Sequence, residues 1–466
     1  MSITLLERPE AQALLNDAEL HPATVRGCEE QLTSFLQRYL PLFYRVEQRD
    51  HARVVIEGKL SGLERKTCEP IARRVGEKRK PIQIFVGAGA WDDEAVMREL
   101  RVAVGEKIGD PDGILIVDGS AFVKKGDESC GVKRQWCGRL GKVENCQVGV
   151  FLAYATARGH APLDRQLFLP EDWANDATRR VKCHVPESVV FQEKWRLAQQ
   201  LIERSGADVP HRWVVADDEF GRVSTWRAWL RQQRKLYVVD VPSNTLVREV
   251  NERSPDGARP KFETAHAWAA RQPAQRWQTL TIRNGEKGPL RVRVLDAMVQ
   301  TKDDDGRAGP LERLLVTRTL DVKPDQAYAL SNAKHAPLRK VICVGSQRHG
   351  IEEVFQHGKG EVGLAHYEVR SWVGWHHHMT LSFLALWFLV LERCRVGKKN
   401  TGYHDPASAT DFHQAAPEPT PVAGANCGGN HTSAAAHRGG PHLSLLQGHK
   451  TISAPPSCRK HRPQKG

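Results

Sequence analysis

The segment Ile114-Leu115-Ile116-Val117-Asp118 joins four aliphatic residues to one carboxylate. Short aliphatic runs that end at a turn residue, here Gly119, are typical of strands buried inside a sheet. A carboxylate at the end of such a strand projects past the edge of the sheet, where it can reach solvent or a metal ion. We therefore predict a strand over 114–118 that presents the Asp118 carboxylate at an open edge.

Two acids far downstream stand in comparable settings. Asp217 follows the apolar run that begins at Trp213, and Glu352 lies in a stretch with helical patterning. Three converging carboxylates form a cage for hard divalent cations such as Mg²⁺ or Mn²⁺, and two such ions catalyse phosphodiester chemistry. A turn hydrogen bond or a helix cap explains most single strand-end aspartates, so only the combination indicates metal chemistry. The resulting hypothesis has Asp118 bridging two ions, Asp217 holding one and Glu352 holding the other.

The residues around Glu352 favour the same hypothesis. At about 100° per residue, Arg348, Glu352 and Lys359 lie at roughly 0°, 40° and 20° on a helical wheel, so they share one face. A carboxylate flanked by two cations suits a metal ligand with phosphate contacts on either side. The alternative is a solvent-exposed i,i+4 pair between Arg348 and Glu352, which stabilises a helix by only about 0.2–0.5 kcal/mol.

The composition limits the class of protein. A chain of 466 residues exceeds one ordinary core, so two to three structural units are expected. The hydrophobic content of 40% and the charged content of 26% are those of a globular protein. The net charge of +13 favours a polyanionic partner such as nucleic acid, although a generic basic surface explains it equally well.

Cysteine usage and apolar stretches indicate the compartment. The ten cysteines form no CxxC pair, which favours free thiols in a reducing cytoplasm over a metal site. The first eight residues lack the apolar core of a signal peptide. The longest apolar stretch, Met379 to Leu391, is shorter than the roughly 20 residues that span a membrane, so a buried helix is expected. We therefore expect a cytoplasmic protein without a membrane partner.

Periodicity divides the chain into five regions. Residues 1–109 have helical spacing with interleaved basic residues and form the expected DNA-binding region, and 110–241 have the strands and helices of an α/β core. Residues 242–335 form a β-rich insertion between the second and third acids, and 336–399 return to helical patterning. Residues 400–466 lack periodicity, which predicts a disordered basic tail; a frameshifted or non-native end also fits the abrupt change.

Within these regions the pattern predicts individual elements. Strands are expected over 114–118, 134–137, 147–155, a run ending at 217, 236–241, 277–283, 290–298, 314–320 and 326–330. Helices are expected over 25–44, 52–63, 187–205, 225–233, 338–362 and 372–393. The first two acids would then lie on the first and fourth strands.

Several segments resemble those of the DDE insertion-sequence transposases. The matching segments are Ile116–Gly126, Gln135–Gly141, Asn145–Val148, Leu169–Trp173, Val215–Asp217, Lys359–Leu364 and Trp375–His378. The resemblance as a whole extends roughly from Leu63 to Lys399. The resemblance implies an RNase H-like core of mixed α/β class, a β-strand insertion domain, and cut-and-paste movement of a DNA element.

In this branch of the family, the third acid lies in a Y-x2-R-x3-E-x6-K signature. Arg348, Glu352 and Lys359 fill the Arg, Glu and Lys positions, whereas Gly345 stands in place of the tyrosine. The phosphate contact expected of that ring therefore has no counterpart at this position.

The resemblance also distinguishes the second acid from its neighbour. The family's Ala-Asp pattern places it at Asp217 and not at Asp218. Together with Asp118 and Glu352, Asp217 is then a catalytic residue and a ligand of two Mg²⁺ or Mn²⁺ ions.

Four cations near the acids are candidate DNA contacts. Arg348 and Lys359 share the face of Glu352, and Lys124 and Lys125 follow the first acid closely. For Lys124 and Lys125 a solvated loop is an equally good explanation.

Three consecutive histidines, His376-His377-His378, also invite a metal-binding interpretation. Consecutive helical residues point about 100° apart and cannot chelate one ion together. A structural or DNA-facing role is expected instead.

The resemblance implies a transposase that acts on double-stranded DNA, namely the terminal inverted repeats of its own element and the target. Such an enzyme cleaves a strand to release a 3′-hydroxyl group, which then attacks in line, and the pairing of two ends implies a homodimer. Binding to DNA would associate it with the bacterial nucleoid. Two alternatives stay open: a metal-dependent nuclease that cuts without joining, and an inactivated transposase that only binds DNA.

Overall fold

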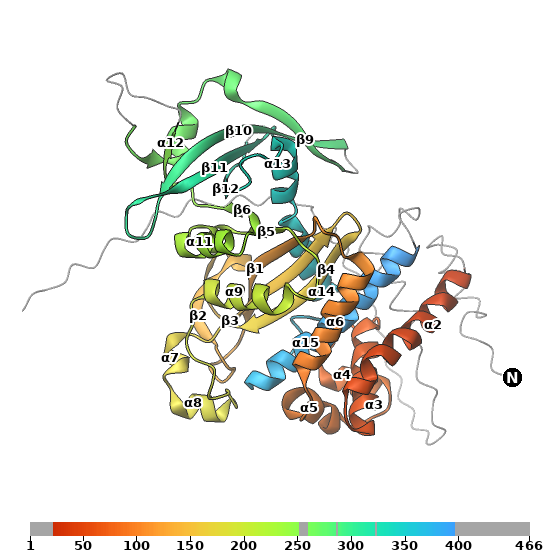
Figure 1. Ribbon diagram of the computed structural model, residues 1–466. Coiled ribbons are helices and arrows are strands. Elements are labelled where there is room, and N and C mark those ends of the chain that lie inside the picture. Colours follow the sequence, from red (N-terminus) through yellow and green to blue (C-terminus); the bar gives the residue numbers. More distant parts are fainter. Residues whose placement is uncertain (1–21, 251–259, 286–287, 322–323, 397–466) are drawn as a thin grey trace, which may run out of the picture.

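The computed structural model describes residues 22–250, 260–285, 288–321 and 324–396 (Figure 1). The tail predicted for 400–466 lies outside the described residues. The helices are α2 (Pro22–Tyr39), η2 (Leu40–Leu42), α3 (Val46–Leu60), α4 (Cys68–Arg74), α5 (Arg79–Ala88), α6 (Asp93–Ile108), η3 (Gly138–Leu140), α7 (Glu171–Ala174), α8 (Ala177–Lys182), α9 (Lys194–Ser205), α10 (Asp218–Gly221), α11 (Ser224–Gln232), α12 (Ala265–Ala270), η4 (Ala274–Arg276), α13 (Leu338–Ser346), α14 (His349–Gly360) and α15 (Trp372–Val396). The strands are β1 (Ile114–Val123), β2 (Lys133–Cys137), β3 (Lys142–Thr156), β4 (Gly159–Leu167), β5 (Trp213–Ala216), β6 (Leu236–Asp240), β7 (Leu246–Glu249), β8 (Glu263–Thr264), β9 (Gln278–Gly285), β10 (Gly288–Lys302), β11 (Ala308–Thr319) and β12 (Gln326–Ser331).

The described strands form one mixed sheet. Its order is β2-β3-β1-β5-β6-β12-β11-β10-β7-β8, with β4 paired to β3 and β9 paired to β10. In the core half, β4 is antiparallel to β3 and β3 to β1, whereas β5 is parallel to both β1 and β6. Three antiparallel strands followed by two parallel ones, with flanking helices, are the RNase H-like α/β arrangement that the family resemblance implied.

The structure adds a strand that the hydrophobic pattern did not predict. β4 pairs with the second half of β3, while β2 pairs with the first half. The apolar pattern of β4 is interrupted by Asp164 and Arg165, which are nevertheless buried. Ion pairs with other buried or half-buried side chains neutralise both charges. A buried strand can therefore contain charged residues that are usually found on a surface. Asp217 therefore follows the fifth strand of the chain and not the fourth.

Two predicted helices have different bounds. The helix expected over 187–205 begins only at Lys194, and the helix expected over 338–362 is divided into α13 and α14. The division lies at Gln347 and Arg348, whose carbonyl groups accept hydrogen bonds from the N–H groups three residues later. Such tighter i→i+3 bonding ends one helix and begins the next.

Consecutive residues of β4 connect the sheet to helices on opposite faces. Asp164 accepts hydrogen bonds from Arg204 and Ser205 of α9, at 2.8 and 2.7 Å. Arg165 donates to the hydroxyl of Thr380 in α15 at 2.9 Å. Because side chains alternate in direction along a strand, α9 and α15 cover opposite faces of the sheet. Figure 1 shows the core sheet between these helices.

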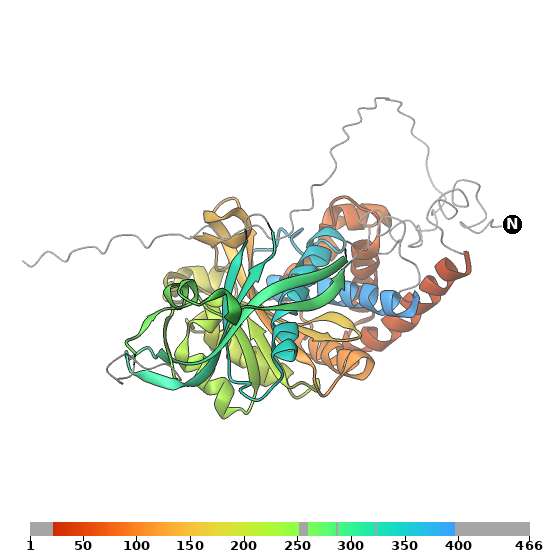
Figure 2. The ribbon, with the colours of Figure 1, turned by 90° about the horizontal axis from the view of Figure 1, so that it is seen from above.

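The insertion extends the core sheet instead of forming a separate one. β12 is antiparallel to β6, with Ala329 opposite Asp240, so hydrogen bonding continues from the core into the insertion. A buried ion pair also connects the core to the insertion: Nε of Arg227 in α11 lies 3.0 Å from Oε1 of Glu312 in β11. The hydroxyl of Tyr237 in β6 donates to the same carboxylate. Figures 1 and 2 show the long strands β9 to β11 projecting from the core.

Helix α15 is largely buried, which confirms the buried helix predicted over Met379–Leu391. Among the described residues, no helix has the length and apolar character needed to cross a bilayer. The histidines of this helix are structural, because His376, His377 and His378 each contact a backbone carbonyl oxygen at 3.0 to 3.2 Å. Burial lowers the pKa of His376 and of His377 to about 4, so both are neutral at pH 7.

Candidate active site

The sequence predicted Asp118 at the end of a strand. In the structure, Asp118 instead lies in the middle of β1. The strand continues to Val123 because its antiparallel pairing with β3 extends to that residue. The parallel pairing with β5 is shorter and ends where Val117 lies opposite Ala216. Asp118 is therefore the first residue of β1 beyond the ladder shared with β5. The open position expected for its carboxylate comes from the short neighbour and not from the end of β1.

Asp118 and Asp217 occupy corresponding positions on neighbouring strands. Asp217 directly follows Ala216, the residue opposite Val117, so the two acids lie at one level of the sheet. Neighbouring strands are about 4.8 Å apart. Asp217 also caps α10, since its Oδ1 accepts a hydrogen bond from the N–H of Glu219 at 3.1 Å. Asp217 is therefore a helix cap, as the alternative explanation proposed, and it also lies close to a second acid.

The two carboxylates are poorly compensated by protein charges. Burial raises the pKa of Asp118 to about 7, and the carboxylates of Glu352 and Glu219 add to this rise against the opposing effect of Arg348. Burial also raises the pKa of Asp217 well above its usual range, and the neighbouring Asp118 is the next cause. A divalent cation would supply the positive charge that this pair of acids lacks.

Glu352 approaches the pair from α14 but bonds to two nitrogen-bearing side chains of its own segment. Its Oε1 lies 3.2 Å from Nη1 of Arg348, and its Oε2 lies 3.1 Å from Nδ1 of His349. The hydrogen bond with His349, followed by the charge of Arg348, lowers the pKa of Glu352. The carboxylate also raises the pKa of Asp118, so Glu352 belongs to the same electrostatic cluster. The i,i+4 ion pair between Arg348 and Glu352, considered above as an alternative to a metal site, is therefore formed, and it belongs to this cluster.

Arg348 lies among four carboxylates. Its Nε is 2.9 Å from Oδ2 of Asp240, the last residue of β6. Although burial opposes the charge, the carboxylates of Asp240, Asp118, Glu352 and Asp217 together raise the pKa of the guanidinium. Asp240 was not among the predicted site residues, although it lies near the end of a predicted strand as Asp217 does. The same strand-end signal could have identified it.

Lys359 is held beside β1 on the side of the acids. Its Nζ donates to the hydroxyl of Ser120 at 3.0 Å. Ser120 lies two residues beyond Asp118 and therefore on the same face of the strand. The rings of Phe122 and Phe355 flank the ammonium group, each with its centroid 5.4 Å away. The predicted wheel face of α14 thus does bring Lys359 to the strand that contains the first acid.

Lys124 and Lys125 have different environments. Nζ of Lys124 donates to the carbonyl oxygen of Tyr367 at 3.1 Å and lies 3.2 Å from the centroid of that ring. Burial lowers the pKa of Lys124 to about 7. Lys124 is therefore built into the packing between β1 and the segment before α15, whereas Lys125 is exposed to solvent.

Gly345 packs α13 closely against β6. A Cβ atom at this position would lie 3.0 Å from Cγ1 of Val238, which is tighter than ordinary contacts between side chains. A side chain at this position would require Val238 to shift by a few tenths of an ångström. The close packing of α13 on β6 therefore favours a small residue here.

The donor chemistry of the cluster fits a hard divalent cation. Asp118 and Asp217 offer carboxylate oxygens at one level of the sheet, and their raised pKa values reflect missing positive charge. Within the described ranges, no group of three His, Cys, Asp or Glu side chains is already arranged to hold a metal ion. In keeping with this, the Glu352 carboxylate faces Arg348 and His349.

A family model described as DDE superfamily endonuclease matches residues 38–289 of this chain. The chain belongs to this superfamily of DDE endonucleases. The matched range contains Asp118, Asp217 and Asp240 and ends before Glu352. Members of the family are nuclease-type enzymes that act on DNA and generally use divalent metal ions.

A curated relative supports the assignment over a shorter range. The probable transposase for insertion sequence element IS701 from Microchaete diplosiphon is 35% identical over 119 residues. These residues cover 25% of this chain and 31% of the relative, so the similarity extends over about a third of that protein.

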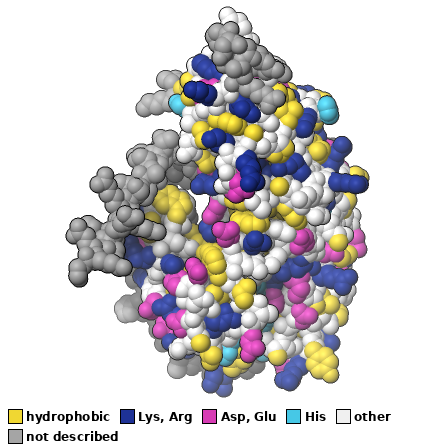
Figure 3. All heavy atoms as spheres, turned by 60° about the vertical axis from the view of Figure 1, so that its left-hand side comes forward, with side chains coloured by type: hydrophobic (Ala, Val, Ile, Leu, Met, Phe, Trp, Pro, Cys, Tyr) yellow, Lys and Arg dark blue, Asp and Glu magenta, His cyan; other side chains and the backbone are white. Residues whose placement is uncertain are grey.

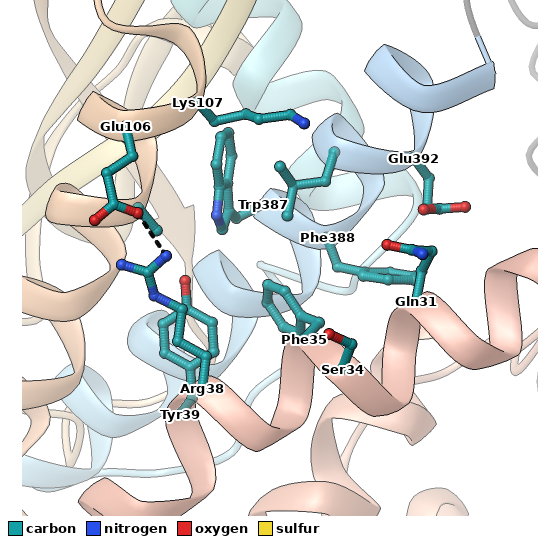
Figure 4. A pocket seen from close by; sticks show the side chains of 12 residues that line it. Gln31, Ser34, Phe35, Arg38, Tyr39, Glu106, Lys107, Trp387, Phe388 and Glu392 are labelled. Atoms are coloured by element: carbon teal, nitrogen blue, oxygen red, sulfur yellow. Dashed lines mark hydrogen bonds and ion pairs between the residues drawn. The ribbon is translucent and has the colours of Figure 1, made fainter.

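A pocket of the DDE endonuclease lies away from its acids. It has a volume of about 280 Å³ and is bounded by α2, α6 and α15 (Figure 4). Phe35, Tyr39 and Trp387 line it, and Arg38 bonds Glu106 beside them at 2.7 Å. None of the three acids contributes to its lining, so this pocket is not part of the candidate active site.

On the face of the molecule drawn in Figure 3, the surface charge is mixed in sign. Figure 3 shows Lys and Arg side chains spread over the insertion and the core, with Asp and Glu side chains among them. The net charge of +13 therefore does not by itself locate a DNA-binding face.

Proposed function

We propose that this DDE endonuclease is a transposase that cleaves the terminal inverted repeats of its own insertion sequence and joins the released ends to target DNA. The observation that carries the proposal is the placement of Asp118 and Asp217 at one level of two parallel strands, with Glu352 in the same electrostatic cluster. The similarity to an IS701 transposase supports the joining step.

Asp118, Asp217 and Glu352 are the proposed ligands of two Mg²⁺ or Mn²⁺ ions. Such ions, when bound, supply Lewis acidity, an activated oxygen nucleophile and a stabilised leaving oxygen. The chain itself supplies rigid placement, because the register between β1 and β5 fixes where the first two carboxylates lie. Ligands on strands hold their geometry better than ligands on loops.

The cations around the cluster are proposed to hold the DNA backbone. Lys359, fixed by Ser120, places an ammonium group one strand repeat beyond the first acid, where it can orient a phosphate. Arg348 can donate to a phosphate with two N–H groups at once. Lys125 is a proposed contact at the exposed end of β1, whereas the bonds of Lys124 to Tyr367 favour a supporting role.

The remaining regions are proposed to bind and pair the DNA ends. Residues 1–109 are the proposed DNA-binding region, and a homodimer would bring two ends together. The insertion over 242–335 would contact DNA next to the cleavage site, since its sheet is continuous with that of the core.

A cleavage assay with a matched pair of variants tests the proposal. The substrate is a labelled duplex with the inverted repeats that flank the gene, and the protein is the full chain with Mg²⁺ or Mn²⁺. Asp217→Asn should lower the cleavage rate about 10³-fold or more, since a metal ligand is lost. Asp218→Asn is the control, because Asp218 pairs with Arg222 on the surface at 3.1 Å, and its rate should stay within a few-fold of wild type. Equal cleavage by wild type and Asp217→Asn would overturn the proposal.

A second assay separates transposase from nuclease. Duplexes with preformed 3′-hydroxyl ends are mixed with plasmid DNA, and joined products are measured. Cleavage without joining would favour the nuclease. DNA binding in a gel shift, together with an inactive wild type, would favour the inactivated transposase.

A further inference from the structure

We infer that Arg348 is a resident counter-cation of the acid cluster before metal ions bind, and that Asp240 is the anchor that holds it there. The inference rests on the proposed function, since it concerns the same carboxylates. It assigns Arg348 a role before DNA is present and Asp240 a role as a positioning residue.

The guanidinium of Arg348, which directly precedes α14, links this helix to β6. Its Nε lies 2.9 Å from Asp240 at the end of β6, and its Nη1 lies 3.2 Å from Glu352 on α14. β5, whose end leads into Asp217, lies between β6 and β1 in the sheet. A planar group with several N–H donors can span such a gap, which a lysine ammonium cannot do in the same way.

Two other cations close to the acids form ion pairs with carboxylates that are not among the three proposed metal ligands. Lys194 lies 2.5 Å from Glu219, and Arg222 lies 3.1 Å from Asp218. The charge of Arg348 opposes the rise in the pKa of both central aspartates.

The same contacts oppose the entry of a divalent cation. A positive charge among the ligands repels an incoming ion, and the bond from Arg348 occupies an oxygen of the Glu352 carboxylate that a metal ion would need. When Glu352 leaves, Asp240 still holds the guanidinium through Nε. The freed Nη groups would then face the position of a DNA phosphate. Arg348 thus exchanges a carboxylate for a phosphate while its anchor stays in place.

Binding of Mn²⁺ to the full chain without DNA tests this inference by calorimetry and by loss of the electron paramagnetic resonance signal of free Mn²⁺. Arg348→Gln should bind Mn²⁺ about tenfold or more tightly than wild type, because a cation among the ligands is removed. Asp240→Asn should bind it about threefold or more weakly, because the guanidinium then rests on the ligands alone. Arg222→Gln removes an exposed cation near Asp217 and should change the affinity by less than about twofold.

The double variant tests whether Asp240 acts through Arg348. In the Arg348→Gln background, Asp240→Asn should have a clearly smaller effect on Mn²⁺ affinity than in wild type. An effect of equal size would show that Asp240 is no anchor. Unchanged or weaker Mn²⁺ binding by Arg348→Gln would overturn the counter-cation role.

If circular dichroism shows that Arg348→Gln does not fold, a more conservative variant, Arg348→Lys, takes its place. Arg348→Lys keeps the charge but cannot bond Asp240 and Glu352 together, so Mn²⁺ binding should tighten about two- to fivefold. Unchanged or weaker binding would overturn the inference here too. If wild type cleaves DNA and neither variant binds Mn²⁺ more tightly, only this inference fails. If Asp217→Asn cleaves like wild type, the proposed function fails.

Discussion

Two aspartates of the same sheet, Asp118 on β1 and Asp164 on β4, have opposite electrostatic environments. Although burial opposes ionisation of Asp164, the neighbouring Arg204, Arg165 and Arg101 lower its pKa to about 2. Burial raises the pKa of Asp118 to about 7. A structural acid is neutralised by charges of the chain itself, whereas the acid of the candidate site has only part of that compensation. The difference identifies Asp118 as a site where positive charge from outside the chain, such as a bound metal ion, would complete the compensation.

The largest expected effect on stability comes from the compensated acid. Asp164→Asn leaves buried arginines without their shared partner and should lower the free energy of unfolding by about 3–5 kcal/mol. Urea unfolding of the full chain measures this change. Asp172→Asn is the control, because the exposed pair with Lys133 contributes at most about 1 kcal/mol. A loss at Asp164 no larger than this control would break the comparison.

Neutralising the other acid should have the opposite sign. In metal-free protein at pH 8, Asp118→Asn removes an ionised carboxylate from a negatively charged cluster. The free energy of unfolding should therefore rise by about 1–2 kcal/mol, and the melting temperature by a few degrees. Thermal unfolding with and without Mn²⁺ measures it, and Mn²⁺ should stabilise wild type but not this variant. Destabilisation of the metal-free variant would contradict the assignment of Asp118 to an uncompensated site.

The pH dependence of stability separates the two acids. The folded-state pKa of Asp118 is raised, so the folded protein holds the extra proton and its stability should fall by up to about 4 kcal/mol as pH rises from about 4 to 7. The folded-state pKa of Asp164 is lowered, so its contribution is present above about pH 4 and lost as pH falls towards 2. Unfolding curves of metal-free wild type and Asp118→Asn should differ in slope between pH 4 and 7. Parallel curves would contradict this prediction.

The smallest effect concerns two neighbouring lysines. Lys125 is exposed, whereas Lys124 bonds Tyr367. Lys125→Gln should reduce the slope of log affinity against log salt for DNA binding by about 1, and Lys124→Gln should leave it unchanged. Fluorescence anisotropy with labelled duplex at several salt concentrations measures both slopes. Equal reductions would show that Lys124 also faces the phosphate backbone.

The sequence predicted those parts of the molecule that local patterns determine. The strands and helices of an α/β protein followed from aliphatic runs and helical spacing, whereas the RNase H-like arrangement was implied by the family resemblance. The runs before Asp118 and Asp217 placed both acids next to strands. Register between strands is a long-range property, so the alignment of Val117 with Ala216 could not be derived. For the same reason, Asp118 was expected at the end of a strand that in fact continues along β3.

The missed features have a common cause. β4 was not predicted because Asp164 and Arg165 make a buried strand resemble a loop, and only distant partners reveal why they are tolerated. Asp240 was overlooked because its significance depends on Arg348, more than one hundred positions away in the chain. A single helix was expected over 338–362 because apolar spacing continues through the division at Gln347.

The pairing of β6 with β12 has a mechanical consequence. β6 ends at Asp240 and belongs to both the core and the insertion, since Ala329 of β12 lies directly opposite that residue. A shared strand cannot act as a hinge, so the twist of the sheet fixes the angle between the insertion and the acids. Under the proposed function, a duplex that contacts both the insertion and the acids would therefore meet two surfaces whose relative placement is fixed by one shared strand.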